Sequence, residues 1–179
     1  MTARTVLDAS DIDRAITRIS HEIVEANHGV NNLLLLGIPT RGVFLASKIA
    51  QAITKNYPEF DAANSVGKLD VTMFRDDLYK NPVKQVTPTV IPVASFEDKT
   101  VILVDDVLFT GRTIRAALDA LVSYGRPKAV RLAVLVDRGH REFPIRADFV
   151  GKNLPTTKHE RIFVKLTETD AEQSVVIEQ

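Results

Sequence analysis

The sequence has no cysteine, no apolar run long enough to span a bilayer and no excess of either charge. Without cysteine there is no disulfide, no thiolate metal site and no cysteine nucleophile, so any metal must bind oxygen or nitrogen. A membrane span needs about 20 consecutive apolar residues, and the first residues are too polar for a secretory signal. The 23 basic residues balance 23 acidic ones, which favours neither nucleic acid nor a membrane surface. We therefore expect a cytoplasmic protein that does not contact membranes.

Charge is nevertheless distributed unevenly along the 179 residues. Residues 126–165 contain ten basic and four acidic side chains, so a basic surface can exist within a neutral chain. The length is that of one domain, and we find neither an internal repeat nor a linker-like segment. The chain is therefore expected to form a single domain over residues 1–179.

Hydrophobic periodicity predicts the elements of the first third of the chain. Isoleucines at helical spacing indicate a helix that begins with a capping box of Ser10 and Asp13 and ends at residues 27–29. Residues 33–36 are continuously apolar and predict a buried strand. A second amphipathic helix follows and ends near residues 57–58, where a proline stops it.

The middle of the chain is less regular. Leu69, Val71 and Met73 alternate with polar residues, which predicts a strand. Residues 80–98 contain three prolines and no sustained period, so we expect a long loop with an extended excursion.

Two more apolar strands follow, at residues 101–104 and 129–136, with a helix between them that ends at residues 125–127. Apolar strands joined by helices are typical of a parallel sheet covered on both faces. The expected fold class is therefore α/β, with a doubly wound and mainly parallel sheet. Shorter strands are expected at residues 161–166 and 174–177.

Two acids and a hydroxyl-rich turn follow the strand at residues 101–104. Asp105 and Asp106 stand where doubly wound sheets bind ligands, beyond the carboxyl end of a strand. Thr110 and Thr113 lie at the start of a helix, where hydroxyls and unpaired amides can cradle a phosphate. Carboxylates beside a phosphate cradle suit a ribose phosphate. The alternative is a strand-end turn in which a threonine only caps the helix.

The segment from residue 101 to residue 113 resembles, over its whole length, the signature of type I phosphoribosyltransferases. The resemblance implies that Asp105 and Asp106 hold the ribose hydroxyls of phosphoribosyl diphosphate and act in catalysis. It also implies that the rest of the segment contacts substrate and that the turn holds the 5-phosphate; these residues are Val107, Leu108, Phe109, Thr110, Gly111, Arg112 and Thr113. The family's fold adds a flexible loop or hairpin, here about residues 75–99, and a small hood.

Residues 37–42 follow the first predicted strand and lie at the same edge of the sheet. The two glycines are spaced as in a Walker loop, but the lysine and hydroxyl residue that should follow are missing. The resemblance implies that Thr40, Arg41 and Gly42 bind diphosphate and that Arg41 neutralises this leaving group in catalysis. The alternative is a solvated loop arginine. Residues 74–78 resemble the start of the family's lid over the reaction, with an acidic hairpin turn as the alternative.

Residues 125–127, 136–148 and 151–155 together resemble a narrower group, the bifunctional pyrimidine operon attenuation regulators that are also uracil phosphoribosyltransferases. This resemblance covers almost the whole domain. It implies that uracil and phosphoribosyl diphosphate give uridine monophosphate (UMP) and diphosphate. Mg²⁺ is expected on the substrate and water, with no metal site made by the protein alone. The base is expected beside Val136, Asp137 and Arg138. Asp137 is also a candidate proton-transfer group, and the alternative is that it serves only as a capping or salt partner.

The regulatory half of the resemblance implies binding of a leader mRNA hairpin, strengthened by uridine nucleotides. The RNA-facing residues are then Thr17, His21, Arg141, Arg146 and Lys152. The basic excess near the last three suits phosphate contacts, although charged runs are usually only solvated. No aromatic stacking platform or RNA-binding module motif is present, so recognition would use shape, backbone and polar edges.

Two other hypotheses stay open. The first is a plain salvage phosphoribosyltransferase without an RNA-binding role, whose basic loop only attracts anionic substrate. The second is a non-catalytic sensor that binds UMP without turning over uracil. The resemblance also implies a homo-oligomer, a dimer or larger.

Overall fold

The structure is a computed structural model that describes residues 3–77 and 86–179. Its centre is a five-stranded sheet with the strand order β3-β2-β4-β5-β6. Every neighbouring pair in this sheet is parallel, as predicted, so the carboxyl ends of the strands meet at one edge. The strands are β2 (Leu33–Gly37), β3 (Val66–Lys68), β4 (Thr100–Leu108), β5 (Ala129–Asp137) and β6 (Phe149–Asn153).

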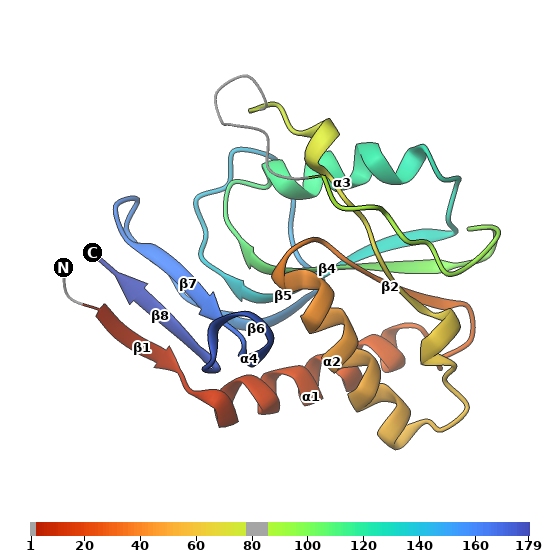
Figure 1. Ribbon diagram of the computed structural model, residues 1–179, viewed down its shortest axis with the longest axis horizontal. Helices are drawn as coiled ribbons and strands as arrows, with labels where there is room; N and C mark the ends of the chain where they lie inside the picture. The colour runs from red at the N-terminus through yellow and green to blue at the C-terminus, as the bar shows by residue number, and fades with distance from the viewer. Residues whose placement is uncertain (1–2, 78–85) are drawn as a thin grey trace.

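Helices cover both faces of this sheet (Figure 1). Apolar side chains of α1 (Ala9–Ala26) and α2 (Arg41–Asn56) form one core against it, and those of α3 (Arg112–Val122) form a second core on the other face. The strands are apolar on both sides because both sides are buried. The predicted doubly wound α/β class is confirmed.

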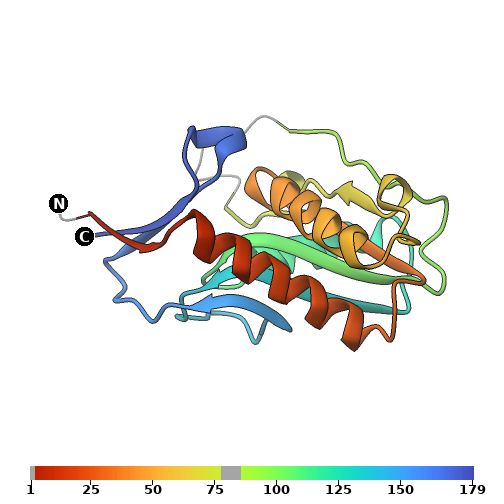
Figure 2. The ribbon, with the colours of Figure 1, turned by 90° about the horizontal axis from the view of Figure 1, so that it is seen from below.

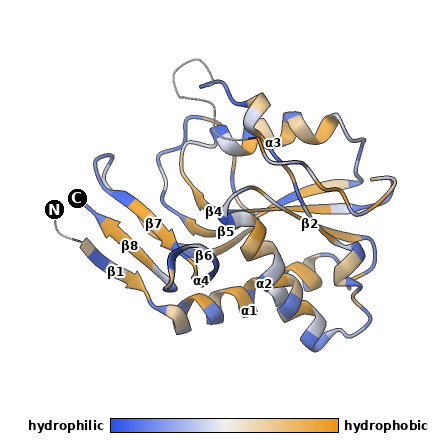
Figure 3. Ribbon diagram, viewed as in Figure 1, coloured by the Kyte–Doolittle hydropathy of each residue, from blue (hydrophilic) through white to orange (hydrophobic). Residues whose placement is uncertain are grey.

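A smaller antiparallel sheet stands beside the large one, with the order β1-β8-β7. It consists of β1 (Ala3–Leu7), β7 (Arg161–Lys165) and β8 (Ser174–Glu178), and α4 (Thr167–Asp170) joins the last two strands. Hydrophobic residues run along β7 and β8 (Figure 3), and some of them pack into the core under α1 and α2. We call this unit, residues 155–179 with β1, the hood. Figure 2 shows β1 and β8, the first and last strands, side by side in it.

The capping box of α1 lies two residues earlier than the sequence predicts. A side-chain oxygen of Asp8 accepts the Asp11 amide at 2.8 Å, and the Asp8 amide donates to the Asp11 carboxylate at 3.1 Å. The prediction of Ser10 and Asp13 is therefore wrong. A carboxylate accepts helix amides as a serine does, and its charge adds a favourable interaction with the helix dipole.

The predicted strand over Leu69, Val71 and Met73 is also wrong. The strand β3 ends at Lys68, and residues 72–74 form a short 3₁₀ turn that leaves Met73 66% exposed. The cause is Asp70, whose carboxylate accepts the amides of residues 72 and 87, both at 2.7 Å. A side chain that accepts nearby amides in this way draws the chain out of a strand.

The expected long loop is present where the structure describes it. Residues 86–98 form no helix or strand, although Val90 pairs with Lys68 through two backbone hydrogen bonds of 2.9 and 3.0 Å. The rest of the expected loop, residues 78–85, lies outside the described residues. Among the helices of the described chain, none is long and apolar enough to cross a membrane.

Candidate active site

The strand β4 continues through the two predicted acids. Asp105 pairs with Val134 and Val107 with Val136 in the parallel ladder, so the strand extends four residues beyond its predicted end. The Asp106 amide donates to the Asp105 carboxylate at 2.9 Å, and the Val107 amide donates to the Asp106 carboxylate at 2.8 Å. Each acid is thus held by the next residue's backbone at the ligand-binding edge of the sheet.

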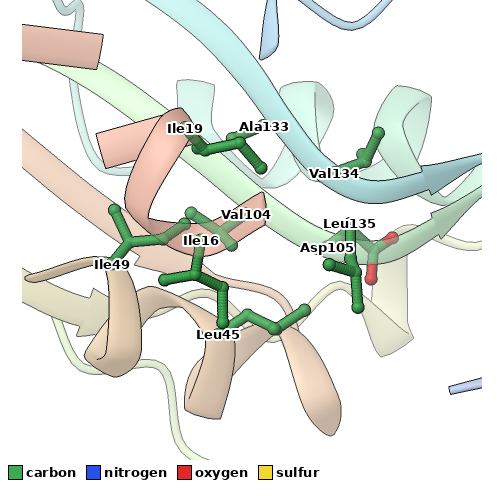
Figure 4. Close-up of a pocket in the computed structure, with 9 residues that line it drawn as sticks. All are labelled: Ile16, Ile19, Leu45, Ile49, Val104, Asp105, Ala133, Val134 and Leu135. Atoms are coloured by element: carbon green, nitrogen blue, oxygen red, sulfur yellow. The ribbon is translucent and has the colours of Figure 1, made fainter. Parts of the chain in front are cut away.

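The environments of the two acids differ. Asp105 is 8% exposed, whereas Asp106 is only half-buried. A cavity of about 10 Å³ lies beside Asp105 and has apolar walls from α1, α2, β4 and β5. Figure 4 shows the carboxylate oxygens of Asp105 turned away from Ile16 and Ile49 of these walls. Burial, and then the neighbouring charge of Asp106, raise the pKa of Asp105 well above its usual 3.8.

The turn between β4 and α3 has the form of a phosphate cradle. Gly111 is the N-cap of α3 with φ of 91°, a conformation that glycine adopts most readily, and no side chain of residues 3–77 or 86–179 caps the helix. The hydroxyl of Thr110 accepts the Arg112 amide only at a long 3.4 Å, and Thr113 is half-buried. The alternative in which a threonine serves as the N-cap is therefore wrong. The first-turn amides of α3 have no helical partner and can bind an anion.

Arg112 stands at this turn with partners of its own. Its guanidinium pairs with Asp76 at 2.5 Å and with Glu142 at 2.6 Å, and it lies over the ring of Phe143 at 5.1 Å. The two acids come from different segments, one from the segment before the long loop and one from the loop after β5. Arg112 therefore links the turn to both loops.

The loop before α2 lies directly against the end of β4. The Ile38 amide donates to the Val104 carbonyl at 2.9 Å, and a Cβ atom at Gly42 would lie 2.3 Å from the same oxygen. Only glycine fits at position 42. Of the three residues expected to bind diphosphate, Gly42 is next to Asp105, whose Cα would lie 3.3 Å from a Cβ at position 42, and Thr40 is exposed.

Arg41 is not a solvated loop arginine. Its Nη2 donates to both carboxylate oxygens of Asp170 at 2.9 and 3.1 Å, and its Nε is buried without a partner among the described residues. The Thr169 hydroxyl, the Leu166 amide and the Arg41 guanidinium lower the pKa of Asp170 to about 2. A second ion pair, Lys48 with Glu168 at 2.9 Å, joins the same two helices. Two ion pairs therefore link the hood to α2.

The expected lid segment contributes another cation near the acids. Arg75 binds Asp77 through two hydrogen bonds of 2.8 Å, and its charge acts on Asp105. Phe74 ends the 3₁₀ turn and residues 75–77 follow it as an irregular segment, whereas Leu78 lies outside the described residues.

A cleft of about 440 Å³ opens beyond the carboxyl end of β5, between this strand's loop and the hood. The buried Val136 leads into it. Asp137 accepts the Gly139 amide at 2.9 Å and pairs with Arg141, so the salt-partner role is present. The cleft is lined by Asp137, Arg138, Gly139, His140, Arg141, Asn153, Pro155 and Thr156.

Arg138 forms the fixed wall of this cleft. It is 7% exposed, donates to the Thr156 hydroxyl at 3.1 Å and donates to the carbonyls of Thr157 and Glu160 at 3.1 and 2.8 Å. Its guanidinium lies 4.0 Å from the centre of the Phe109 ring. The Leu108 carbonyl also accepts the Arg138 amide at 3.1 Å. The cleft and the acidic segment of β4 are therefore parts of one site.

The predicted RNA-facing residues fall into separate groups. Thr17 and His21 are exposed on the outer side of α1, where Arg18 between them donates to the carbonyls of Val150 and Gly151. Lys152, the next residue of β6, is therefore beside this face of α1.

The other two predicted RNA-facing residues lie elsewhere. Arg146 lies in a groove beside α3, with Ile114 and Leu118 among its neighbours. The guanidinium of Arg141 donates to the Asp137 carboxylate and to three backbone carbonyls, those of Ile145, Phe109 and Gly139. Its nitrogens are therefore already used in contacts around the loop after β5. These contacts give Arg141 a structural role that the sequence did not indicate.

Several residues of the site were missed by the sequence reasoning. Asp170 and Glu168 come from the acidic tail, and His140, Asn153 and Thr156 line the cleft. The segment containing His140 was singled out for its charge, so its position after β5 could have indicated a cleft residue. Nothing in the local sequence around Asp170 points to Arg41.

No cluster of three or more His, Cys, Asp or Glu side chains suited to a metal ion occurs in residues 3–77 and 86–179. Asp105 and Asp106 present carboxylate oxygens, which Mg²⁺ prefers as ligands. Two carboxylates fit an ion that shares its other ligands with substrate and water, but they do not form a complete protein site.

Comparisons with known proteins identify the family. The family model for the phosphoribosyl transferase domain matches residues 3–169. A bifunctional protein PyrR from Leifsonia xyli subsp. xyli is 61% identical, covering 100% of this chain and 98% of its own, and one from Streptomyces coelicolor is 55% identical, covering 98% and 89%. The hypoxanthine phosphoribosyltransferase of Trypanosoma cruzi shares the fold, with a TM-score of 0.69 and 16% identity over 97% of this chain and 95% of that one. The chain therefore belongs to the phosphoribosyl transferase family and, within it, to the bifunctional PyrR proteins.

Proposed function

We propose that the protein transfers the phosphoribosyl group of phosphoribosyl diphosphate to uracil, and that it also binds a pyrimidine leader mRNA hairpin in response to uridine nucleotides. One observation supports the first activity, namely that two parts of the site are in contact. The acids of β4 and the phosphate turn are joined to the cleft beyond β5 by the contact of Arg138 with Phe109.

The sugar is assigned to the acids and the turn. Asp105 and Asp106 each use a side-chain oxygen for a backbone amide, which leaves oxygens to accept the two ribose hydroxyls. The 5-phosphate then lies on the first-turn amides of α3 and the hydroxyls of Thr110 and Thr113. The intervening Val107 and Leu108 belong to the strand that sets the distance between these two subsites.

The diphosphate is assigned to residues 40–42. Diphosphate leaves as the bond to the anomeric carbon breaks, and the sugar carbon becomes cation-like. The chemistry needs positioned charge more than a protein nucleophile. Arg41 lies at the start of α2, where its charge and the helix amides face the leaving group. Mg²⁺, when bound with phosphoribosyl diphosphate, neutralises part of the diphosphate charge. Residues 74–77, the described part of the expected lid, are proposed to close over the site and exclude water.

The base is assigned to the cleft beside Val136, Asp137 and Arg138. Arg138 is fixed by the hood and by Phe109, so the cleft keeps its shape before the base arrives. Backbone amides and carbonyls of this loop can pair with the edge of uracil. Asp137 is held by Arg141 and helps to shape the loop.

The RNA is assigned in the first place to the outer face of α1 and the adjoining β6. Thr17, His21 and Lys152 are exposed there, and Lys152 supplies a cation for phosphate contact. Arg141 and Arg146 are proposed to extend the contact over the loop after β5. Asn153 lines the base cleft directly after Lys152, which favours the regulator over a plain salvage enzyme because a nucleotide in the cleft would lie beside an RNA-binding residue.

Two further properties follow from this assignment. A salvage enzyme that also regulates transcription acts where nucleotides and mRNA are present, so we propose a cytoplasmic location. We also propose a homo-oligomer, a dimer or larger. The surface of α3 supports this, because Leu118 and Val122 remain 39% and 77% exposed.

The enzyme activity is tested by release of diphosphate from phosphoribosyl diphosphate, with and without uracil. The expected result is uracil-dependent release in the purified protein and its loss in Asp106→Asn, with the unfolding temperature unchanged. Asp119→Asn, an exposed acid of α3, is the matched control. Uracil-independent release, or none, would exclude the proposed reaction.

The regulatory activity is tested by titration of a pyrimidine leader hairpin with and without UMP. We expect UMP to increase the affinity at constant salt. Turnover of uracil without any effect of UMP on RNA binding would leave the plain salvage enzyme. Binding of UMP without turnover would favour the non-catalytic sensor.

A further inference from the structure

His140 is held in the base cleft by contacts from two other parts of the chain. Its Nε2 lies within hydrogen-bonding distance of the Thr156 carbonyl oxygen in the hood. Its ring meets the Phe109 ring edge to face, with the centroids 6.2 Å apart and the planes at 77°. The position of the imidazole in the cleft is therefore fixed from both sides.

The contact with Thr156 determines which ring nitrogen carries the hydrogen. A carbonyl oxygen only accepts, so we assign the hydrogen to Nε2. In the neutral ring Nδ1 is then a hydrogen-bond acceptor. Nδ1 has no hydrogen-bond partner among the described residues. It is not buried, so solvent reaches it. His140 thus offers an open acceptor in a residue that lines the cleft.

The charged groups around His140 are already engaged. Asp137 pairs with Arg141 and accepts the Gly139 amide. Arg141 binds three carbonyl oxygens, and Arg138 binds the hood. Since these groups hold one another, a ligand in the cleft meets an acceptor at Nδ1 without first breaking an ion pair.

We propose that His140 is a specificity-determining residue that accepts the N3–H group of uracil at Nδ1. The inference rests on the proposed function of the cleft. Uracil has a hydrogen on N3, whereas cytosine has a lone pair there. With cytosine two lone pairs would face each other, and the buried edge of the ring would lose a hydrogen bond. A site built to pair with a ligand N–H group rejects an analogue without it far more strongly than an apolar pocket does.

The test uses nucleotides, because UMP has N3–H but no N1–H group. Binding of UMP and of cytidine monophosphate is measured at about pH 8, where an ordinary imidazole is neutral. His140→Gly removes the acceptor and suits the local φ of 60°. His140→Asn keeps an acceptor oxygen near the position of Nδ1, and asparagine also tolerates this φ. His159→Asn, at an exposed histidine that does not line the cleft, is the matched control.

The wild-type protein is expected to bind UMP more tightly than cytidine monophosphate. His140→Gly should weaken UMP binding about tenfold, the effect of one lost hydrogen bond, and leave cytidine monophosphate within about twofold. His140→Asn should recover most of the preference, and His159→Asn should not change it. Binding of phosphoribosyl diphosphate by each variant checks that the site is folded. Should His140→Gly fail this check, His140→Ala provides the same comparison.

An unchanged preference for UMP in the folded variant without the acceptor would overturn the role of His140. That outcome leaves the proposed function intact, because the wild-type protein still binds UMP and releases diphosphate with uracil. A wild-type protein that binds neither nucleotide and shows no such release contradicts the proposed function itself, and the inference falls with it.

Discussion

Arg41 and Asp170 are joined across 129 positions of the chain by hydrogen bonds of 2.9 and 3.1 Å, both donated by one guanidinium nitrogen. Arg41 begins the helix that follows the proposed diphosphate loop, and Asp170 ends the short helix of the hood. The other donors of the guanidinium are not used by this pair. Asp170 therefore orients Arg41 without occupying its whole hydrogen-bonding edge.

The first prediction concerns this orientation. Asp170→Asn should raise the KM for phosphoribosyl diphosphate roughly two- to fivefold, the range expected for a partly exposed ion pair, with a smaller change in kcat. Steady-state kinetics at saturating uracil measure both. Glu168→Gln is the matched control, because it removes the neighbouring Lys48 pair without touching Arg41. Equal effects of the two variants would show that Asp170 only holds the hood in place.

The second prediction concerns the cost of burying Asp105. Asp105→Asn should abolish turnover and yet raise the unfolding midpoint at neutral pH. A rise of about 2–4 °C is expected, which corresponds to about 1 kcal/mol in a chain of this size. The reason is that the wild-type fold buries the carboxylate of Asp105 beside the charge of Asp106. A lowered midpoint at neutral pH would contradict this explanation.

The pH dependence of that difference has a definite sign. Because the pKa of Asp105 is raised on folding, the folded state binds the proton more tightly than the unfolded state does. The contribution of Asp105 to the free energy of unfolding of the wild type is at its maximum below about pH 4, and it falls as the pH rises through the folded pKa. The advantage of Asp105→Asn should therefore be absent near pH 4 and complete above the folded pKa. Thermal unfolding of both proteins over this range measures it.

The third prediction concerns Arg138. Arg138→Lys keeps the charge but loses the fork that binds two carbonyls and a hydroxyl, and it loses the contact of the guanidinium with the Phe109 ring. The free energy of unfolding should fall by about 2 kcal/mol, and the KM for uracil should rise. Denaturant unfolding and kinetics measure these effects. Arg161→Lys, an exposed residue of β7, is the control. A variant as stable as the wild type would show that these contacts add nothing.

The fourth prediction separates RNA binding from turnover. Lys152→Gln should weaken binding of the leader hairpin and reduce the slope of log affinity against log salt by about 0.7–0.9, the value for one lost phosphate contact. Uracil turnover should stay within about twofold, because Lys152 is exposed and does not line the base cleft. Lys158→Gln in the hood is the control. An unchanged salt slope would remove Lys152 from the RNA surface.

Local sequence was sufficient for the centre of the fold. The strands β4 and β5 are apolar because both faces of the sheet are covered, and this continuity is visible in the residues alone. The position of the acids of β4 was also predictable, because residues that directly follow an apolar parallel strand lie at the edge of the sheet. The edge strands β1 and β6 carry charged and small residues and gave no such pattern.

Contacts between distant residues account for the rest. Asp70 ends β3 by binding the amide of Thr87, and Arg41 finds its partner in Asp170. His140 and Thr156 meet only because the hood folds back over the loop after β5. The periodicity of a segment cannot predict a partner that the topology supplies.

A crystal structure of the protein with phosphoribosyl diphosphate tests the central claim most directly. We predict the ribose hydroxyls on the carboxylates of Asp105 and Asp106, the 5-phosphate on the turn of residues 110–113 and the diphosphate beside Arg41. A sugar bound elsewhere on the molecule, or acid side chains that do not contact it, would contradict the account.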